Sequence, residues 1–405
     1  MRPGTVFGPT LLLAATLALT PAAASPLKTR PALDSRPTRA AITAAVQHER
    51  RLYGTDTEIP GVLVGVWDRA GSAYVHGFGY ADLATNRRLT QQDHFRIGSN
   101  TKTFVISVLL QLVDAGRLRL DDPISRFPLG VAIPDAAHIT IRELCQMRSG
   151  LFEAYDTPEV ARLHLTPDLH LDPRRLIAWA VRQPPYFPPG AGYHYSNTNY
   201  LILGLLIRAL IGRSVATEIR DRLLIPFHLT ETSYPAGPAM PPPWAHGYRP
   251  ARLGGWQDVS DALPVSLLGA AGAMVSTIGD MQRWLHLWLG GRTNGAATQR
   301  ARLACLPTGA GNLEFGLGVG CSAGWYGYTG VVPGYSTADY ENPAAGVTVV
   351  AWVNAEADEP VPGVANAIVR AIARIVTPGQ VPFLLAPPGA HPAEVHVMAP
   401  EMTGG

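Results

Sequence analysis

The order of the predicted elements constrains the fold of this chain more than any other feature. Gly61 to Asp68 and Ser72 to Tyr80 flank a short turn and predict an antiparallel hairpin. Late in the chain, Ser336 to Tyr340 and Val347 to Asn354 predict a second hairpin. Residues 117 to about 270 carry mostly helical patterns between them. The economical arrangement is one antiparallel sheet built from both ends of the chain, with the central block as a second, helical lobe.

Predicted helices complete this α+β arrangement. Thr38 to Tyr53 has apolar residues at helical spacing, and Val364 to Val376 is amphipathic, so each end supplies a helix to flank the sheet. Phe104 to Val113 is apolar on nearly every face, which predicts a buried helix. Leu201 to Ile211 is a further helix, and Trp325 to Val332 a further strand. We expect the ligand site at the junction of the two lobes.

The N-terminus predicts export. Arg2 provides a positive start, Leu11 to Leu19 is a short apolar run, and three alanines precede Ser25. This is the form of a cleaved secretory signal peptide; an uncleaved membrane anchor is the alternative. The predicted parts are a signal peptide (1–24), a linker (25–37), a folded domain (38–376, with a sheet lobe at about 38–98 and 271–376 and a helical lobe at about 99–270) and a disordered tail (377–405).

Composition excludes several classes of protein. The 405 residues are 47% hydrophobic and 16% charged, which is typical of a globular chain rather than a disordered one. The chain has 33 Lys+Arg against 31 Asp+Glu, and this net charge of +2 lacks the excess of positive charge that is typical of nucleic-acid-binding proteins. Beyond the N-terminus, no apolar run approaches the roughly 18 residues of a membrane span. We expect a soluble, secreted monomer without a cofactor or metal ion.

One lysine stands out because the chain uses arginine almost everywhere. Among its 33 basic residues, only Lys28 and Lys102 are lysine. Ser99 lies three residues before Lys102, so the two side chains share one face at the start of the buried helix. A buried lysine has a lowered pKa and can take a proton from a serine hydroxyl, which arginine cannot do. Alternatively, Ser99 is a helix cap and Lys102 extends to water.

Two later motifs could complete a site. Tyr195-Ser196-Asn197 follows a turn-rich stretch, and its phenol could relay a proton while its amide orients a substrate amide. Tyr328-Thr329-Gly330 lies on a predicted strand whose edge could bind an extended substrate. Helix capping and an ordinary strand are the respective alternatives.

Taken in order, the three motifs resemble the serine β-lactamase and penicillin-binding-protein family. The similarity extends to the flanking runs FRIGSNTKTF, PPGAGYHYSNTNY and GYTGVVPGYS, and also to MRSGL at Met147 and MVSTIGDMQRWL at Met274. It spans roughly residues 38–376 and is greatest to exported D-alanyl-D-alanine carboxypeptidases. The resemblance implies a β-lactamase/transpeptidase-like fold and hydrolysis through an acyl-enzyme.

The resemblance also implies roles for individual residues. Ser99 would be the acylated nucleophile, Lys102 its base, and Tyr195 the group that passes the proton to the leaving amine. The backbone N–H groups of Ser99 and Val331 would form the oxyanion hole. The implied substrate-binding residues are Asn197, Tyr328, Thr329, Gly330 and Val331.

This chain departs from the family at the third motif. The motif normally begins with Lys or His, whereas here it begins with Tyr328, and residues 315–328 contain no Arg or Lys. The sequence therefore leaves open whether the site recognises the free C-terminal carboxylate of a substrate. The substrate is expected to be a small peptide, an ester or a β-lactam. The alternatives are an esterase or amidase, a weak β-lactamase, or a penicillin-binding sensor without turnover.

Other signals carry less weight. Ser322 lies in a G-x-S-x-G run, but the glycine-containing stretch after it does not predict the helix that a nucleophile elbow requires. His164, His170 and Asp172 lack a metal-ligand pattern, and His194 is expected to line the site or to be exposed. Cys145 is expected to be a buried thiol. Cys305 and Cys321 could pair in an exported protein; the resemblance places a disulfide cysteine at Cys321 without identifying its partner.

Overall fold

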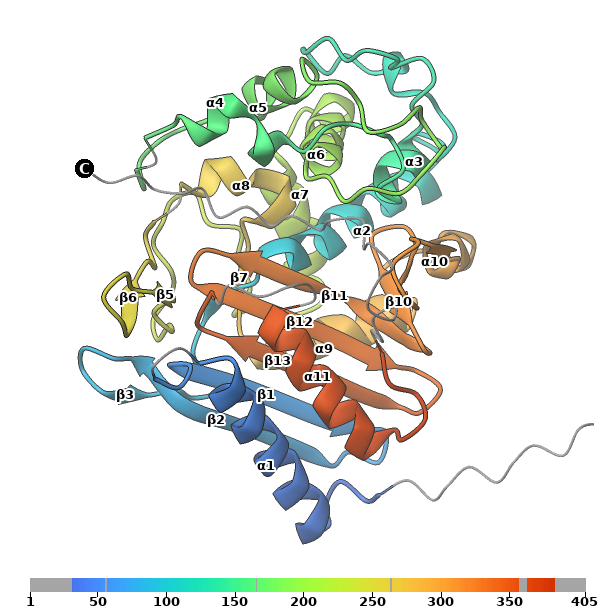
Figure 1. Ribbon diagram of the computed structural model, residues 1–405. Coiled ribbons are helices and arrows are strands. Elements are labelled where there is room, and N and C mark those ends of the chain that lie inside the picture. The colour runs from blue at the N-terminus through green and yellow to red at the C-terminus, as the bar shows by residue number, and fades with distance from the viewer. Residues whose placement is uncertain (1–30, 55–56, 165, 263, 357–362, 383–405) are drawn as a thin grey trace, which may run out of the picture. The chain divides into compact units, whose positions relative to one another are not determined.

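The computed structural model describes residues 31–54, 57–164, 166–262, 264–356 and 363–382 (Figure 1). The predicted signal peptide, Lys28 and residues 25–30 of the predicted linker lie outside these ranges.

A nine-stranded antiparallel sheet is formed from both ends of the chain, as predicted. Its order is β3-β2-β1-β13-β12-β11-β10-β9-β8. Strand β1 of the first hairpin pairs with β13 of the last, with Val64 opposite Ala351. The strands are β1 (Gly61–Asp68), β2 (Ala73–Asp82), β3 (Arg87–Arg88), β8 (Leu306–Pro307), β9 (Glu314–Phe315), β10 (Gly320–Ser322), β11 (Trp325–Val332), β12 (Tyr335–Asn342) and β13 (Val347–Val353).

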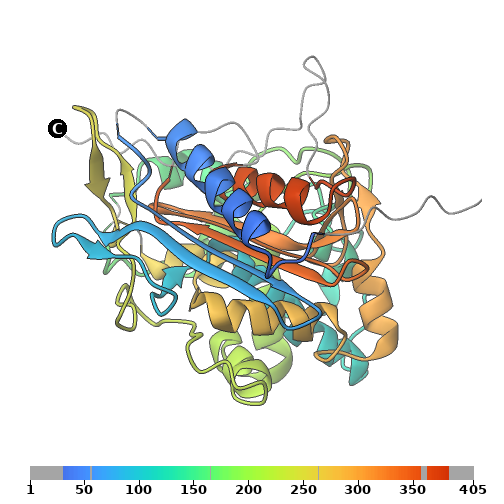
Figure 2. The ribbon, with the colours of Figure 1, turned by 90° about the horizontal axis from the view of Figure 1, so that it is seen from below.

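The two terminal helices, α1 (Arg36–Leu52) and α11 (Gly363–Val376), lie side by side on one face of the sheet (Figure 2). Their apolar residues, such as Ile42 and Ile368, are buried against that face. Isolated helices of this length are only marginally stable in water. The burial of these apolar side chains is therefore what mainly stabilises both helices.

Both ends of the folded domain differ from the sequence expectation. The Ser35 hydroxyl accepts a hydrogen bond from the Thr38 N–H, so α1 begins within the predicted linker, and Leu33 is buried in the same cluster. At the other end, residues 377–382 belong to the predicted disordered tail. They pack on the sheet instead, where the Trp325 indole donates to the Gln380 carbonyl at 2.7 Å.

The opposite face of the sheet carries α2 (Thr101–Asp114), α9 (Ile278–Leu289) and the helical lobe. Phe104 of α2 stacks on Trp284 of α9, with ring centroids 4.0 Å apart. The remaining helices are α3 (Ile141–Cys145), α4 (Pro158–Ala161), α5 (Pro173–Ala180), α6 (Thr198–Ile211), α7 (Val215–Ile219), α8 (Val265–Gly272) and α10 (Ala296–Leu303). Short 3-10 or π turns are η1 (Gly98–Asn100), η2 (Ile124–Arg126), η3 (Ala154–Asp156) and η4 (Arg220–Leu224).

Two small ribbons, which the sequence did not predict, accompany the helical lobe. Strands β4 (Phe95–Arg96) and β7 (Val275–Ser276) pair just before η1, and β5 (Tyr248–Pro250) pairs with β6 (Trp256–Asp258). Within the described ranges, no single helix is long and apolar enough to cross a membrane. One pair, α6 with Val215–Leu224, would meet those criteria together but is bent by 78°.

Candidate active site

The turn η1 places Ser99 directly against strand β11. Gly98 has a left-handed φ of +50°, and a Cβ there would lie 2.9 Å from the Val331 nitrogen. Gly330 faces the turn from the strand, and a Cβ on it would lie 2.0 Å from the Ile97 carbonyl oxygen. Glycine at both positions therefore allows this close approach.

A buried side-chain contact fixes the same turn. The Asn100 amide donates to the Thr337 hydroxyl on β12 at 3.0 Å, and both residues are almost fully buried. Ser99 lies at the start of helix α2, where unpaired N–H groups and the helix dipole favour negative charge.

The amine of Lys102 connects three elements. Its Nζ donates to Ser99 Oγ at 2.8 Å, to Asn197 Oδ1 at 2.7 Å and to the Ala271 carbonyl at 2.7 Å. The side chain is fully buried, and burial lowers the pKa of the amine to about 7. A neutral amine would turn its lone pair toward the Ser99 hydroxyl, so the geometry suits proton transfer between them.

A buried carboxyl group that the sequence analysis missed adjoins this network. Glu153 lies just before η3, and its carboxylate accepts hydrogen bonds from the backbone N–H groups of Asn197 and Tyr155. Burial raises the pKa of Glu153 to about 7, and its negative charge in turn raises the pKa of Lys102. An acidic residue inside the apolar run Leu151 to Ala154 was the available signal.

Two phenols extend the network away from the serine. The Tyr195 hydroxyl shares a hydrogen bond with the Ser99 side chain, and Lys102 Nζ lies 5.1 Å from the Tyr195 ring centre. The Tyr328 hydroxyl donates to the Tyr195 hydroxyl at 3.4 Å. Burial raises the pKa of both phenols, so both are neutral near pH 7.

The outer edge of β11 is open beside the serine. The strand pairs with β12 from Tyr326 to Val332, but β10 pairs only with Trp325 to Gly327. In the described part of the chain, no strand covers Tyr328 to Val332 on that side. Thr329 and Val331 are half-buried there. The structure thus links Lys102, Asn197, Tyr195 and Tyr328 to Ser99 in one hydrogen-bond network. Gly330 and Val331 lie against the turn that carries Ser99, and Thr329 lies beside them on the same strand.

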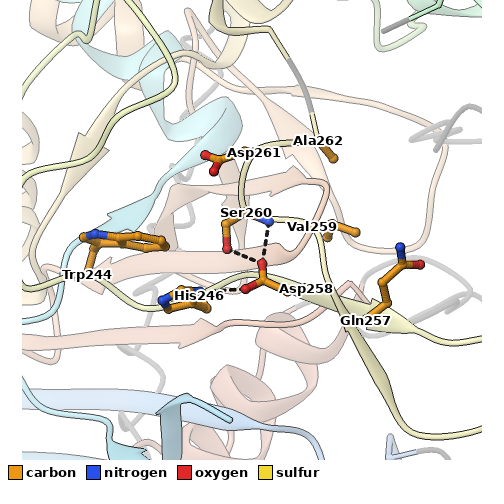
Figure 3. A pocket seen from close by; sticks show the side chains of 8 residues that line it. All are labelled: Trp244, His246, Gln257, Asp258, Val259, Ser260, Asp261 and Ala262. Atoms are coloured by element: carbon orange, nitrogen blue, oxygen red, sulfur yellow. Dashed lines mark hydrogen bonds and ion pairs between the residues drawn. The ribbon is translucent and has the colours of Figure 1, made fainter. Parts of the chain in front are cut away.

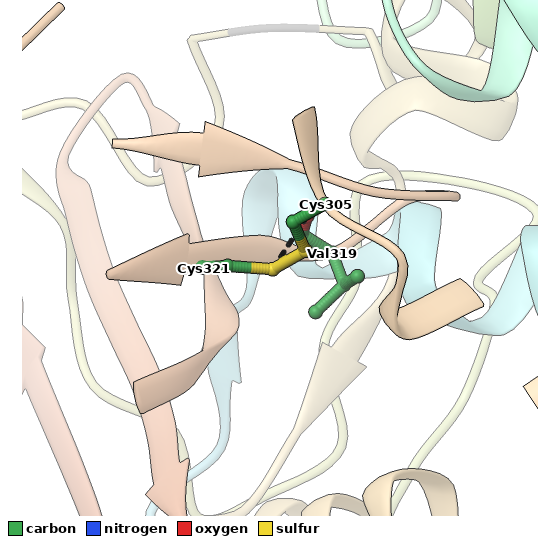
Figure 4. The surroundings of a disulfide bond; sticks show 3 residues. All are labelled: Cys305, Val319 and Cys321. Atoms are coloured by element: carbon green, nitrogen blue, oxygen red, sulfur yellow. Dashed lines mark hydrogen bonds between the residues drawn. A yellow bond between two sulfur atoms is a disulfide. The ribbon is translucent and has the colours of Figure 1, made fainter. Parts of the chain in front are cut away.

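The residues set aside in the sequence lie elsewhere or act differently. Ser322 is paired with Trp325 in a tight hairpin, so no helix follows it. The His194 ring stacks on Tyr186, with centroids 3.5 Å apart. Cys305 and Cys321 form a disulfide (Figure 4), while Cys145 is a buried thiol. Among the described residues, no group of three His, Cys, Asp or Glu is arranged to hold a metal ion.

A separate hollow of about 420 Å³ adjoins the β5–β6 ribbon (Figure 3). Hydrogen bonds link its wall: Asp258 contacts His246 Nδ1 at 2.7 Å and accepts two hydrogen bonds from Ser260. None of the predicted site residues lines it. The lining residues are Trp244, His246, Gln257, Asp258, Val259, Ser260, Asp261 and Ala262.

A serine hydroxyl held against a buried lysine at the start of a central helix, between an antiparallel sheet and a helical lobe, is the arrangement of serine hydrolases with the β-lactamase/transpeptidase-like fold. The beta-lactamase family profile matches residues 38–374, and the chain belongs to this family.

Solved structures share the fold over more than 80% of this chain. A D-stereospecific amidohydrolase from Streptomyces sp. is 28% identical, with a TM-score of 0.71 over 81% of this chain and 97% of the other. A penicillin-binding protein from Bacillus halodurans, 21% identical, has a TM-score of 0.69 over 82% and 98% of the two chains. At that identity, the second similarity concerns the fold alone.

Curated relatives match over shorter stretches. A beta-lactamase from Escherichia coli K12 is 27% identical over 229 residues, which is 56% of each protein. Protein flp from Staphylococcus aureus N315 is 29% identical over 44% of this chain and 35% of its own length. Penicillin-binding protein 4* from Bacillus subtilis is 29% identical over 39% of this chain and 34% of its own length. The chain therefore spans between a third and just over half of these relatives.

Proposed function

We propose that this protein is an exported serine hydrolase that forms an acyl-enzyme on Ser99 and acts on amides or peptides of D-amino acids. The observation that carries the proposal is the 2.8 Å contact between Lys102 Nζ and Ser99 Oγ, at an amine removed from water. Amide and β-lactam substrates fit the family. The D-configuration is supported by the similarity to the Streptomyces D-stereospecific amidohydrolase.

The proposed mechanism gives each group one step. Neutral Lys102 takes the Ser99 proton as the oxygen attacks the substrate carbonyl. The N–H groups of Ser99 and Val331 hold the oxyanion; one such donor is worth about 2.7–4 kcal/mol in other hydrolases. Asn197 accepts from Lys102 through Oδ1, so its amide N–H₂ can face the substrate. Tyr195 passes the proton to the leaving nitrogen, and water then releases the acyl group.

A D-alanyl-D-alanine carboxypeptidase, the activity that the sequence resemblance implied, is the second candidate. It is favoured by the match to penicillin-binding protein 4* and by Thr329, which lies half-buried on the open strand edge. It requires recognition of a free carboxylate, for which Tyr328 supplies no charge. A sensor that is acylated without turnover has the same geometry and differs only in deacylation.

The test starts from the nucleophile. The protein is incubated with an uncharged alkyl fluorophosphonate, and the modified peptide is mapped by mass spectrometry. We expect the label on Ser99 and its complete loss in Ser99→Ala; labelling of another residue would reject the acyl-enzyme proposal. Steady-state rates on a D-amino-acid amide, a D-Ala-D-Ala peptide, a short ester and a cephalosporin then distinguish the candidates. A burst without turnover would identify a sensor.

Export remains part of the proposal and rests on residues 1–24. When the full chain is produced in a bacterial host, we expect a mature N-terminus at Ser25 outside the cytoplasm. An intact N-terminus in the membrane fraction would instead identify an anchor. The monomeric state also stays a prediction, which light scattering of the mature protein would measure.

A further inference from the structure

Tyr328 occupies the position where the family resemblance expects a cation, and its surroundings are aromatic. Its ring meets Phe315 edge-on at 5.8 Å, and Phe315 packs at 5.7 Å against Tyr193. We name Tyr193, Phe315 and Tyr328 the aromatic cluster. The exposed fractions of Tyr328 and Phe315 are only 3% and 5%, so little water reaches this side of the serine.

The charges near Tyr328 are as informative as its packing. The ionisable groups that act most on its phenol are three other tyrosines, Tyr193, Tyr195 and Tyr200, and no cation is among them. Lys102 already contacts Ser99, Asn197 and the Ala271 carbonyl. The cation of the cluster is Arg148, which acts on Tyr193 and donates to the carbonyls of Gly192 and Pro307. A substrate carboxylate placed against Tyr328 would therefore lose its hydration without gaining an ion pair at that phenol, which is unfavourable.

We propose that Tyr328 is a positioning residue for Tyr195 and that, together with the aromatic cluster, it restricts the enzyme to substrates whose leaving group carries no carboxylate. The inference rests on the proposed acyl-enzyme function and narrows its substrate class to neutral amides and esters.

The proton transfers of the acylation step explain how the phenol of Tyr328 supports Tyr195. During acylation the ester bond between Ser99 Oγ and the acyl carbon forms, and the carbon–nitrogen bond breaks. The proton lost by Ser99 goes to Lys102, and Tyr195 gives its own proton to the leaving nitrogen before Lys102 replaces it. The Tyr328 hydroxyl donates to Tyr195 throughout and keeps its proton. This hydrogen bond stabilises the charge that develops on the Tyr195 oxygen and fixes its direction.

A matched pair of substrates tests the specificity. An N-acyl-D-Ala-D-Ala peptide and its C-terminal carboxamide differ only by the charge of the leaving group. We expect the wild-type kcat/KM to favour the carboxamide by about tenfold or more, the scale of a missing charged hydrogen bond. Tyr328→Lys, or Tyr328→His if the first variant does not fold, should shift this ratio toward the carboxylate by a similar factor. The ratio does not depend on the fraction of active enzyme.

Two further variants separate positioning from packing. Tyr328→Phe keeps the ring but removes the hydroxyl, so we expect amide hydrolysis to fall about tenfold. Hydrolysis of a nitrophenyl ester, whose leaving group needs no proton, should change far less. Tyr326→Lys, on the same strand and half-buried, is the control and should leave the substrate ratio unchanged.

The outcomes distinguish this inference from the proposed function. If fluorophosphonate labels Ser99 but neither Tyr328→Lys nor Tyr328→His moves the ratio, the inference about Tyr328 is wrong and the hydrolase proposal stands. A wild-type preference for the free carboxylate would overturn the inference in the same way. If Ser99 is not labelled at all, the proposed function itself fails.

Discussion

At the scale of single residues, the amine of Lys102 must lose a proton before it can take one from Ser99. Full burial and the pKa of about 7 make this possible near neutral pH. Lys102→Arg keeps a positive charge but removes the ability to deprotonate. We therefore expect acylation to slow by about 10²–10⁴-fold, the usual contribution of a positioned base. Stopped-flow measurement of acylation by a chromogenic ester would give the rate.

Folding has to be measured alongside, because the guanidinium is larger than the amine. Lys102→Met removes the charge at similar size, and we expect it to be as inactive as the arginine variant while its thermal unfolding stays near that of the wild type. Wild-type acylation rates in either variant would show that Lys102 is not the base.

Glu153 controls the pH at which that base becomes available. Its carboxylate raises the pKa of Lys102, so Glu153→Gln should lower that pKa. Since the deprotonated amine is the active form, kcat/KM rises with pH through the pKa of Lys102, near 7 in the wild type. The acidic limb of the profile should therefore move to lower pH in Glu153→Gln. A limb displaced to higher pH, or unmoved while the rate is retained, would contradict this coupling; Asp121→Asn, at an exposed ion pair, is the control.

At the scale of elements, the contact between η1 and β11 aligns the nucleophile with the predicted oxyanion hole. A methyl group on Gly330 would collide with the Ile97 carbonyl, so Gly330→Ala should separate the turn from the strand. We expect a loss of about 1–3 kcal/mol in the free energy of unfolding and a larger loss of kcat than of substrate affinity. Gly279→Ala, at an exposed helical position with open space, should be neutral or slightly stabilising. Unfolding by urea and steady-state kinetics check both, and equal effects of the two substitutions would refute the role of the contact.

The sequence identified those elements whose pattern is local. Strand β11 has the predicted bounds, and both hairpins and α2 follow from short apolar runs. No local pattern predicts the approach of Gly98 to Val331, because it joins residues far apart in the chain through backbone packing; only the family resemblance implied it, through the oxyanion hole. Glu153 was missed for the same reason: only the fold brings its carboxylate to the Asn197 N–H. The β5–β6 ribbon has strands of three residues, too short for an alternating pattern to show.

At the scale of the whole molecule, the sheet separates two hydrophobic clusters, one under α1 and α11 and the other shared with the helical lobe. The site lies on the second, next to the edge of the sheet formed by β8, β9 and β10. These strands have only two or three residues each, so backbone pairing holds them weakly. The disulfide between Cys305 and Cys321 joins the segment before β8 to β10 and thereby ties this edge to the body.

The disulfide therefore stabilises the part of the molecule that carries Phe315 of the aromatic cluster. It links cysteines 16 positions apart, and a closed loop of about 15 residues contributes about 3 kcal/mol in the chain-entropy account. We expect Cys305→Ser with Cys321→Ser to lower the free energy of unfolding in urea by that amount, and reductant to do the same to the wild type.

Thiol labelling counts the free cysteines. We expect no labelled thiol in the native protein, because Cys145 is buried and burial raises its pKa. We expect one labelled thiol after unfolding and three after unfolding with reduction. Three labelled thiols without reductant would show that the bond does not form. Unchanged urea unfolding in the double variant would show that the strand pairing alone holds this edge.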